Sequence, residues 1–248
     1  MSEQSTPYEG QTILQHINEL RIYLTRALIG MALATILSFA FAQKLLEFLI
    51  APYGDLLDVI SPTEGIETYF KVALASGIIL SMPWILLQLW HFIAPGLERS
   101  EKQYVYIFVP SATFLFLTGV AFAWFVLLPA AITFLSTFMA DIFEARWISR
   151  EYISFATTFL LWLGISFEMP LIIYFLARFG VISSTTLREQ WRIAVVGIAI
   201  LAAAITPSVD PVTMMLTMVP LLILYILSIG LAAVGQRQFR KDVALDNE

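Results

Sequence analysis

Residues 152–177 read YISFATTFLLWLGISFEMPLIIYFLA, and this stretch decides the fold. Its only Asp, Glu, Lys or Arg side chain is Glu168. An ionised side chain at the middle of a bilayer costs about 2.5–3.5 kcal/mol even on a lenient insertion scale, and about 20 apolar residues are enough to cross the hydrocarbon core. The stretch therefore predicts a helix that spans a membrane.

The whole chain has the same apolar character. Of its 248 residues 59% are hydrophobic and 13% are charged, whereas soluble domains have roughly 45–50% and about 25%. Lipid removes the need for the polar surface of a soluble domain, so the composition indicates an integral membrane protein. The absence of cysteine excludes a disulfide framework, a thiol nucleophile and a cysteine-based metal site.

Five further windows lack charged side chains, and they cover residues 27–43, 72–97, 103–140, 193–209 and 211–236. The 103–140 window is too long for one span and contains Pro129, so we expect a crossing that ends near Leu128, followed by an apolar surface helix. The prediction is a single all-α transmembrane domain, 1–248, with polar tails at 1–15 and 236–248. Its six spans are 22–42, 68–92, 104–128, 153–177, 191–206 and 212–232.

The basic residues predict the orientation. With the N-terminus in the cytoplasm, six spans leave ten of the 14 Lys and Arg residues inside, and only Lys44, Lys71, Arg146 and Arg150 outside. Both termini are therefore expected in the cytoplasm. The first apolar run is expected to be a retained anchor and not a cleaved signal, because a long polar region with acidic residues precedes it.

Local patterns predict how the helices begin and end. Ser61 to Glu64 has the form of a capping box that starts the second span, and Thr186 with Glu189 has the same spacing before the fifth span, after Gly180 ends the fourth. Residues 43–59 and 129–143 are expected to form short helices on the outer surface. The fifth span, 193–205, is only about 20 Å long against a core of ~30 Å, so bilayer thinning or packed polar ends must accommodate it.

Glu168 is the sharpest candidate for function. A carboxylate within a membrane must face protein or water and find a proton or a partner, so it is either a functional group or a structural hydrogen bond between helices. Pro170 frees the carbonyl of Ser166 and should bend the helix, which favours a concave, partly wet face. A proton-coupled secondary transporter that uses Glu168 is one function consistent with this residue.

Further carboxylates lie at the inner ends of the spans. Glu19 precedes the first span, and Glu98 and Glu101 follow the second. They are either solvated loop charges or partners for guanidinium groups, which carboxylates bind in strong, often bidentate pairs. His16 and His91 lack metal-ligand spacing, and no catalytic set, metal site, cofactor motif or nucleotide-binding pattern emerges, so an enzyme is not expected.

Several motifs together resemble the TatC family, the multi-spanning signal-receptor subunit of the twin-arginine protein translocase. The resemblance covers roughly His16 to Gly230. The motifs are His16 to Arg21, Ala51-Pro52, Ser61-Pro62-Thr63-Glu64, Phe92 to Glu98 with Glu101, Ser166 to Pro170, Thr206-Pro207 and Asp210-Pro211. Each motif alone is weak, and their combination is specific.

The resemblance implies a cup-shaped bundle of six spans in the inner membrane of a prokaryote. Such a protein binds the twin-arginine signal peptides of folded export substrates and recruits the single-span TatA and TatB subunits, with energy from the proton-motive force. It also implies a homo-oligomer within the assembled complex, and no nucleic-acid partner. A purely structural membrane scaffold is a third possibility besides the receptor and the transporter.

The resemblance also assigns residues to roles. Glu19 and Glu101 would contact the paired arginines of the signal, Phe92 and Pro95 would shape that patch, and Arg21 and Glu98 belong to the same two motifs. Glu168 and Pro170 would lie in the intramembrane cavity, and Pro52 and Asp210 on the periplasmic side. Thr206 and Met214 would contact a partner helix, although Met214 stands where the family often has glutamine.

Overall fold

The computed structural model describes residues 13–93, 105–142, 146–206 and 210–245, and these residues are almost entirely helical. The apolar windows form long helices because a helix satisfies its own backbone hydrogen bonds, as the interior of a bilayer requires. The helices are α1 (Ile13–Phe39), α2 (Ala42–Ile50), α3 (Glu64–Ile93), α4 (Val105–Phe122), η3 (Ala123–Leu127), α5 (Leu128–Thr137), α6 (Ser149–Phe167), α7 (Met169–Arg178), α8 (Ser184–Glu189), α9 (Trp191–Ile205) and α10 (Pro211–Leu245).

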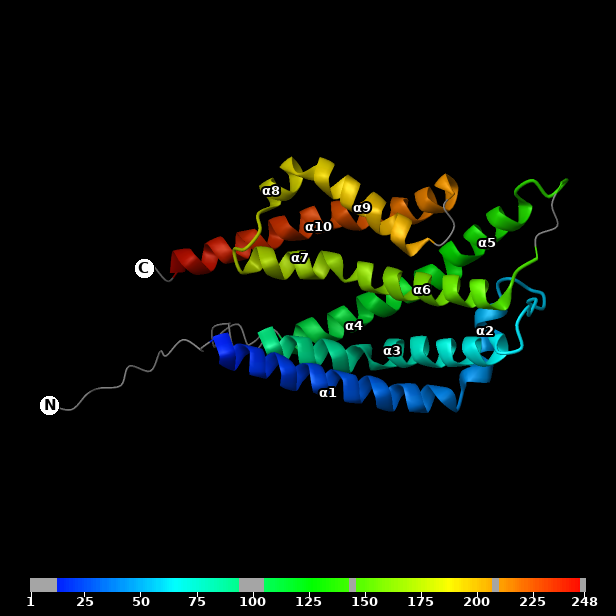
Figure 1. The fold of residues 1–248 in the computed structure, drawn as a ribbon. Helices are drawn as coiled ribbons and strands as arrows, with labels where there is room; N and C mark the ends of the chain where they lie inside the picture. Colours follow the sequence, from blue (N-terminus) through cyan, green and yellow to red (C-terminus); the bar gives the residue numbers. More distant parts are fainter. Residues whose placement is uncertain (1–12, 94–104, 143–145, 207–209, 246–248) are drawn as a thin grey trace.

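Five stretches of these helices are long and apolar enough to cross a membrane, and α9 is a shorter apolar helix. The predicted all-α membrane fold is confirmed, including a fifth apolar helix that is much shorter than the others: α9 has 15 residues, against 30 in α3. The beginning of α1, α8 and the end of α10 lie at one end of the molecule, while α2 and α5 lie at the other (Figure 1). We call these the terminal end and the opposite end.

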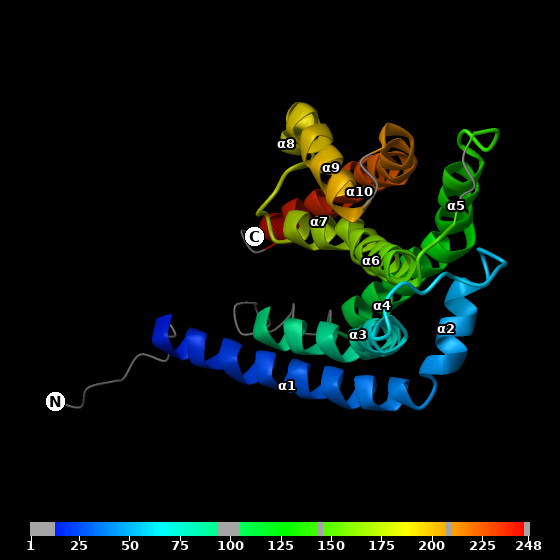
Figure 2. The same ribbon diagram turned by 45° about the vertical axis from the view of Figure 1, so that its right-hand side comes forward.

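The helices form two groups that α4 and α6 join. α1 packs along α3 in one group, and α7 and α9 pack against α10 in the other (Figure 2). α4 packs on α6, and both contact α3. The contact between α4 and α6 is close because a Cβ atom at Gly164 would come within 2.7 Å of the Phe116 ring. This packing fixes the position of α6, which carries Glu168.

The third apolar window, residues 103–140, stays helical where we expected a crossing to end and a surface helix to begin. η3 is a turn of π-helix in which the Leu128 amide donates to the carbonyl of Ala123, and α5 then continues with Pro129 in its first turn. Proline has no backbone N–H to donate to a carbonyl of the preceding turn. A π-turn changes the spacing of the backbone hydrogen bonds just before Pro129, so the helix can continue past this residue. Helical structure thus runs through Leu128, where we expected the crossing to end.

The junctions between helices follow the predictions only in part. Gly180 ends α7 with φ of 73°, and the Val181 amide donates to the carbonyl of Leu176 at 2.9 Å, as in a glycine C-cap. The predicted cap at Thr186 is wrong: Ser183 caps α8, and its hydroxyl accepts from the Thr186 amide at 3.0 Å. The prediction placed the cap too late because it overlooked the short helix α8 between the two apolar helices.

Candidate functional site

An apolar groove lies between α1 and α3 at the terminal end. Its volume is about 130 Å³. The side chains of Tyr23 and His91 stack beside it with ring centroids 6.1 Å apart, which joins the two helices there. The groove is lined by Leu20, Tyr23, Leu24, Ala27, Ile85, Gln88, Leu89 and Phe92.

The groove brings together residues that are far apart in the sequence. Phe92 lines it from the end of α3, and Glu19 is one helical turn before Tyr23 on the same side of α1. Glu19 is partly buried, whereas Arg21 is exposed. The predicted site residues Pro95, Glu98 and Glu101 lie outside the described residues. The sequence did not single out Gln88, although this polar side chain in an apolar window is 5% exposed and lines the groove.

Glu168 lies at a break between α6 and α7. The helix is interrupted at this residue, and Pro170 stands in the first turn of α7, as expected for a proline that removes a backbone donor. The side chain of Glu168 is 3% exposed. Within the described part of the chain, its Oε1 atom is buried and has no hydrogen-bond partner.

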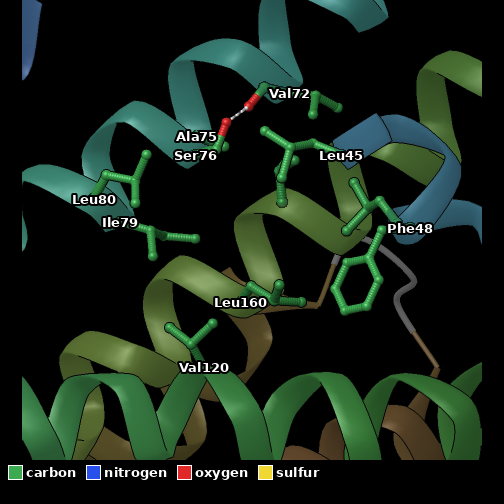
Figure 3. A pocket seen from close by; sticks show the side chains of 11 residues that line it. Leu45, Phe48, Val72, Ala75, Ser76, Ile79, Leu80, Val120 and Leu160 are labelled. Carbon is green, nitrogen blue, oxygen red and sulfur yellow. Dashed lines mark hydrogen bonds between the residues drawn. The ribbon is translucent and has the colours of Figure 1, made fainter. Parts of the chain in front are cut away.

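A second cavity, of about 210 Å³, opens between α2, α3, α4 and α6 (Figure 3). Leu45 and Phe48 reach it from α2, and Leu160 reaches it from α6. Glu168 and Pro170 do not line this cavity, since Glu168 follows Leu160 by about 12 Å along the helix axis. The cavity lining is almost wholly apolar, so it can hold hydrocarbon but offers no group for proton transfer.

At the opposite end, the buried carboxylate of Glu64 connects two segments of the chain by hydrogen bonds. This carboxylate is 1% exposed and accepts hydrogen bonds from Ser149 Oγ and the Arg150 amide, both at 2.7 Å, and from the amides of Ile60 at 3.0 Å and Ser61 at 3.2 Å. The bond from Ser61 is one half of the predicted capping box. The bonds from Ser149 and Arg150 join α3 to α6, and no local pattern in the sequence predicts them.

Comparison with known proteins identifies the family of this chain. The family described as "Sec-independent protein translocase protein (TatC)" matches residues 15–220. The chain belongs to the TatC family. All of the motifs that carried the resemblance, from His16 to Pro211, lie within the matched residues.

Individual TatC proteins are similar over most of their length. The "Sec-independent protein translocase protein TatC" of Helicobacter pylori strain J99 is 39% identical over 217 residues, which cover 88% of this chain and 87% of that protein. The protein of the same name from Carboxydothermus hydrogenoformans is 36% identical over 224 residues, 89% of this chain and 92% of that protein. The "Crystal Structure of Twin Arginine Translocase Receptor- TatC" superposes with a TM-score of 0.81 at 33% identity, covering 89% of this chain and 99% of that one.

These findings make the chain a multi-pass membrane component of a Sec-independent protein translocase, and they do not favour a proton-coupled transporter. Two of the predicted TatC positions, Thr206 and Asp210, lie where α9 ends and α10 begins. Thr206 is buried and its hydroxyl donates to the Ala202 carbonyl at 2.9 Å. Asp210 caps α10, because its Oδ1 atom accepts from the amides of Val212 at 3.1 Å and Thr213 at 2.7 Å.

The other two predicted TatC positions lie apart from each other. Met214 is partly buried in the first turns of α10, and it packs against the main hydrophobic core. Pro52 lies in the turn that follows α2. The predicted residues that the structure describes therefore lie in four places: at or beside the groove of the terminal end, at the break at Glu168, in the turn after α2, and where α9 ends and α10 begins.

Proposed function

We propose that this TatC family member is the receptor of a twin-arginine translocase and binds the signal peptides of folded export substrates at the groove between α1 and α3. The observation that carries the proposal is the partly buried carboxylate of Glu19 beside an apolar groove that Phe92 lines. A twin-arginine signal offers two guanidinium groups followed by apolar residues, so it is complementary to a carboxylate beside an apolar surface.

In this proposal the segment between α3 and α4 completes the site. Glu101 is the second acceptor for the arginine pair, with Glu98 beside it, and Pro95 shapes the patch together with Phe92. Arg21 is exposed on α1 two residues after Glu19 and belongs to the same motif, so we include it in the proposed site. The specificity for arginine over lysine follows from the planar guanidinium, which matches a carboxylate with two parallel hydrogen bonds.

The test is photo-crosslinking of a twin-arginine signal peptide to the membrane-embedded protein. Glu19→Gln and Glu101→Gln should each lower crosslinking on the order of tenfold, since a hydrogen bond to a charged group contributes about 1.5–3 kcal/mol. Glu47→Gln is the matched control, because Glu47 is an exposed acid on α2 at the opposite end. A di-lysine peptide should crosslink weakly to all variants. Unchanged crosslinking in the Glu19→Gln, Glu101→Gln double variant would refute the carboxylate mechanism.

After capture, we propose that the apolar part of the signal enters the membrane near Glu168. A buried carboxylate oxygen such as Glu168 Oε1, which has no hydrogen-bond partner among the described residues, is costly, and a role during translocation explains its presence. Export of a twin-arginine substrate should fall strongly in Glu168→Gln, which keeps the shape and removes the ionisable group. Normal export by this variant would make ionisation irrelevant.

We also propose that the edge formed by α9 and α10, with Thr206 and Met214, binds the single-span TatA and TatB subunits. A 15-residue helix spans less than the bilayer core, and a partner helix would cover the mismatch. The working protein is then a homo-oligomer with these partners in the inner membrane of a prokaryote. It is driven by the proton-motive force, catalyses no reaction itself, and has both termini and the signal site in the cytoplasm.

Cysteine crosslinking tests the partner edge. Met215→Cys, an exposed position on the edge formed by α9 and α10, should trap a single-span partner, and Ile36→Cys on α1 should not.

A further inference from the structure

A polar pocket lies between α8 and the last turns of α10. Figure 1 shows these two helices on the side of the molecule away from α1 and α3. Its volume is about 310 Å³. Unlike the groove and the cavity described above, it is lined mainly by basic and polar side chains. These are Ser184, Thr185, Arg188, Gln236, Arg237 and Arg240.

Hydrogen bonds hold the two walls of this pocket in place. The Ser184 hydroxyl donates to Gln236 Oε1 at 3.1 Å, and the Tyr225 hydroxyl donates to the Leu187 carbonyl at 2.6 Å. Both bonds join α8 to α10. These bonds hold α8 against α10. The arginines of the pocket, which come from both helices, are therefore kept close together.

The charge in the pocket is uncompensated by the described side chains. Arg237 and Arg240 are three residues apart and share one face of α10, and Arg188 faces them from the last turn of α8. Among residues whose side chains the structure describes, no carboxylate pairs with these arginines or lines the pocket, although Glu189 is exposed next to Arg188. Three guanidinium groups around one space favour an anion, and guanidinium matches phosphate in a bidentate geometry.

The surface beside the pocket changes from basic to apolar within one helical turn. Val234 is 46% exposed on α10, one turn before Arg237, and Leu231 is 39% exposed one turn further. Trp191 is 53% exposed at the start of α9, with the Arg192 guanidinium 5.7 Å from its ring centroid. Exposed Trp and Arg at the boundary of apolar helices mark the level of the lipid headgroups.

We propose that this pocket binds the phosphate group of an anionic phospholipid, whose acyl chains lie along the exposed apolar surface of α10. A basic pocket at the headgroup level between transmembrane helices is the arrangement that recognises anionic lipid headgroups. The site is separate from the signal groove, so lipid binding is independent of the proposed receptor function. The bound lipid would hold α8 against α10 and neutralise the three arginines.

The experiment is native mass spectrometry of the full detergent-solubilised protein, titrated with phosphatidylglycerol or phosphatidylcholine. Phosphatidylglycerol should bind the wild-type protein at least about tenfold more tightly than phosphatidylcholine, given roughly 1 kcal/mol per arginine near a lipid surface. The Arg237→Gln, Arg240→Gln variant should lose about tenfold in affinity for phosphatidylglycerol. Arg188→Gln, on the other wall, should show a smaller loss in the same direction.

The matched control is the Arg21→Gln, Arg26→Gln variant, which removes two exposed arginines of α1 at the terminal end, outside the pocket. It should bind phosphatidylglycerol like the wild type. Equal binding of the two lipids, or an equal loss in the control and pocket variants, would overturn the proposal. Displacement of the lipid by equimolar inorganic phosphate would also overturn it, because the site would then be one for the free anion.

Discussion

Glu64 and Glu168 are both buried carboxylates in apolar helices, and they differ in what surrounds them. Glu64 accepts four hydrogen bonds from two separate segments, whereas Glu168 Oε1 has none from the described residues. A fully bonded carboxylate stabilises the structure that supplies its donors, and an unpaired buried one destabilises it. Glu64 therefore has the properties of a structural residue, and the contrast supports the role in translocation that we propose for Glu168.

Glu64→Gln should lower the midpoint of thermal unfolding in detergent, by on the order of 5 °C. Glutamine has one acceptor oxygen where glutamate has two, so the donors on one side, either Ser149 and Arg150 or Ile60 and Ser61, lose their partner. Glu67→Gln is the control, because Glu67 is half-exposed and forms a surface ion pair with Arg150 at 3.2 Å. Equal effects of the two substitutions would show that the buried network adds nothing.

Glu168→Met should leave the thermal midpoint unchanged or raise it, while export of a twin-arginine substrate is lost. An apolar side chain of similar length removes the cost of burying an unpaired carboxyl group. Thermal unfolding and an export assay on the same preparation test both parts. A clear drop in stability would mean that Glu168 has a structural partner and would remove the argument for its function.

At the residue scale, the sequence predicts residues with a local signal better than hydrogen bonds between residues that are distant in the chain. Gly180 stands out as a helix end, and its φ of 73° confirms that prediction. Glu168 stands out because it interrupts an apolar run; its side chain is buried, and its role stays a prediction. The bonds of Glu64 to Ser149 and Arg150 could not be predicted, since they join residues that are far apart in the chain. Only packing of the whole molecule brings those donors to the carboxylate.

At the scale of the helix, the long apolar elements were predictable and their internal irregularities were not. Composition and span length are sufficient for the helices, since a bilayer requires each segment to satisfy its own backbone groups. Pro129 was expected to end a crossing, because a proline breaks the regular α-helical pattern. In the structure a π-turn at Ala123–Leu127 precedes the proline, which lacks a backbone N–H, and the helix continues. No pattern in those residues predicts the π-turn.

Contact between α4 and α6 should depend on Gly164. In Gly164→Ala, the new Cβ would approach Phe116 and Val120 to within 2.7–2.8 Å, so the helices must separate, at a cost of about 1–3 kcal/mol in stability. Gly197→Ala is the matched control in α9, where nothing lies within 4 Å of the new Cβ, and it should stabilise the protein by about 0.5–1 kcal/mol. Thermal unfolding in detergent compares the two. The packing argument fails if Gly164→Ala is as stable as Gly197→Ala.

At the scale of the whole molecule, six predicted crossings are consistent with the positions of the first and last helices. An even number of crossings returns the chain to the side where it began, and the start of α1 and the end of α10 do lie at the same end (Figure 1). The clustering of Arg188, Arg192, Arg237 and Arg240 at this end follows the bias that predicts the cytoplasmic side. The signal groove, the basic pocket and the termini would then share one face of the membrane.

This orientation can be tested directly because the chain contains no cysteine, so a single introduced thiol reports on one position. Asp55→Cys lies in the exposed turn between α2 and α3, and Glu189→Cys lies on the exposed surface of α8. A maleimide that cannot cross the inner membrane should label Asp55→Cys in intact cells and label Glu189→Cys only after lysis. The cysteine-free protein should stay unlabelled throughout. Labelling of Glu189→Cys in intact cells would place the Glu19 groove outside the cytoplasm, where it could not meet a signal peptide before export.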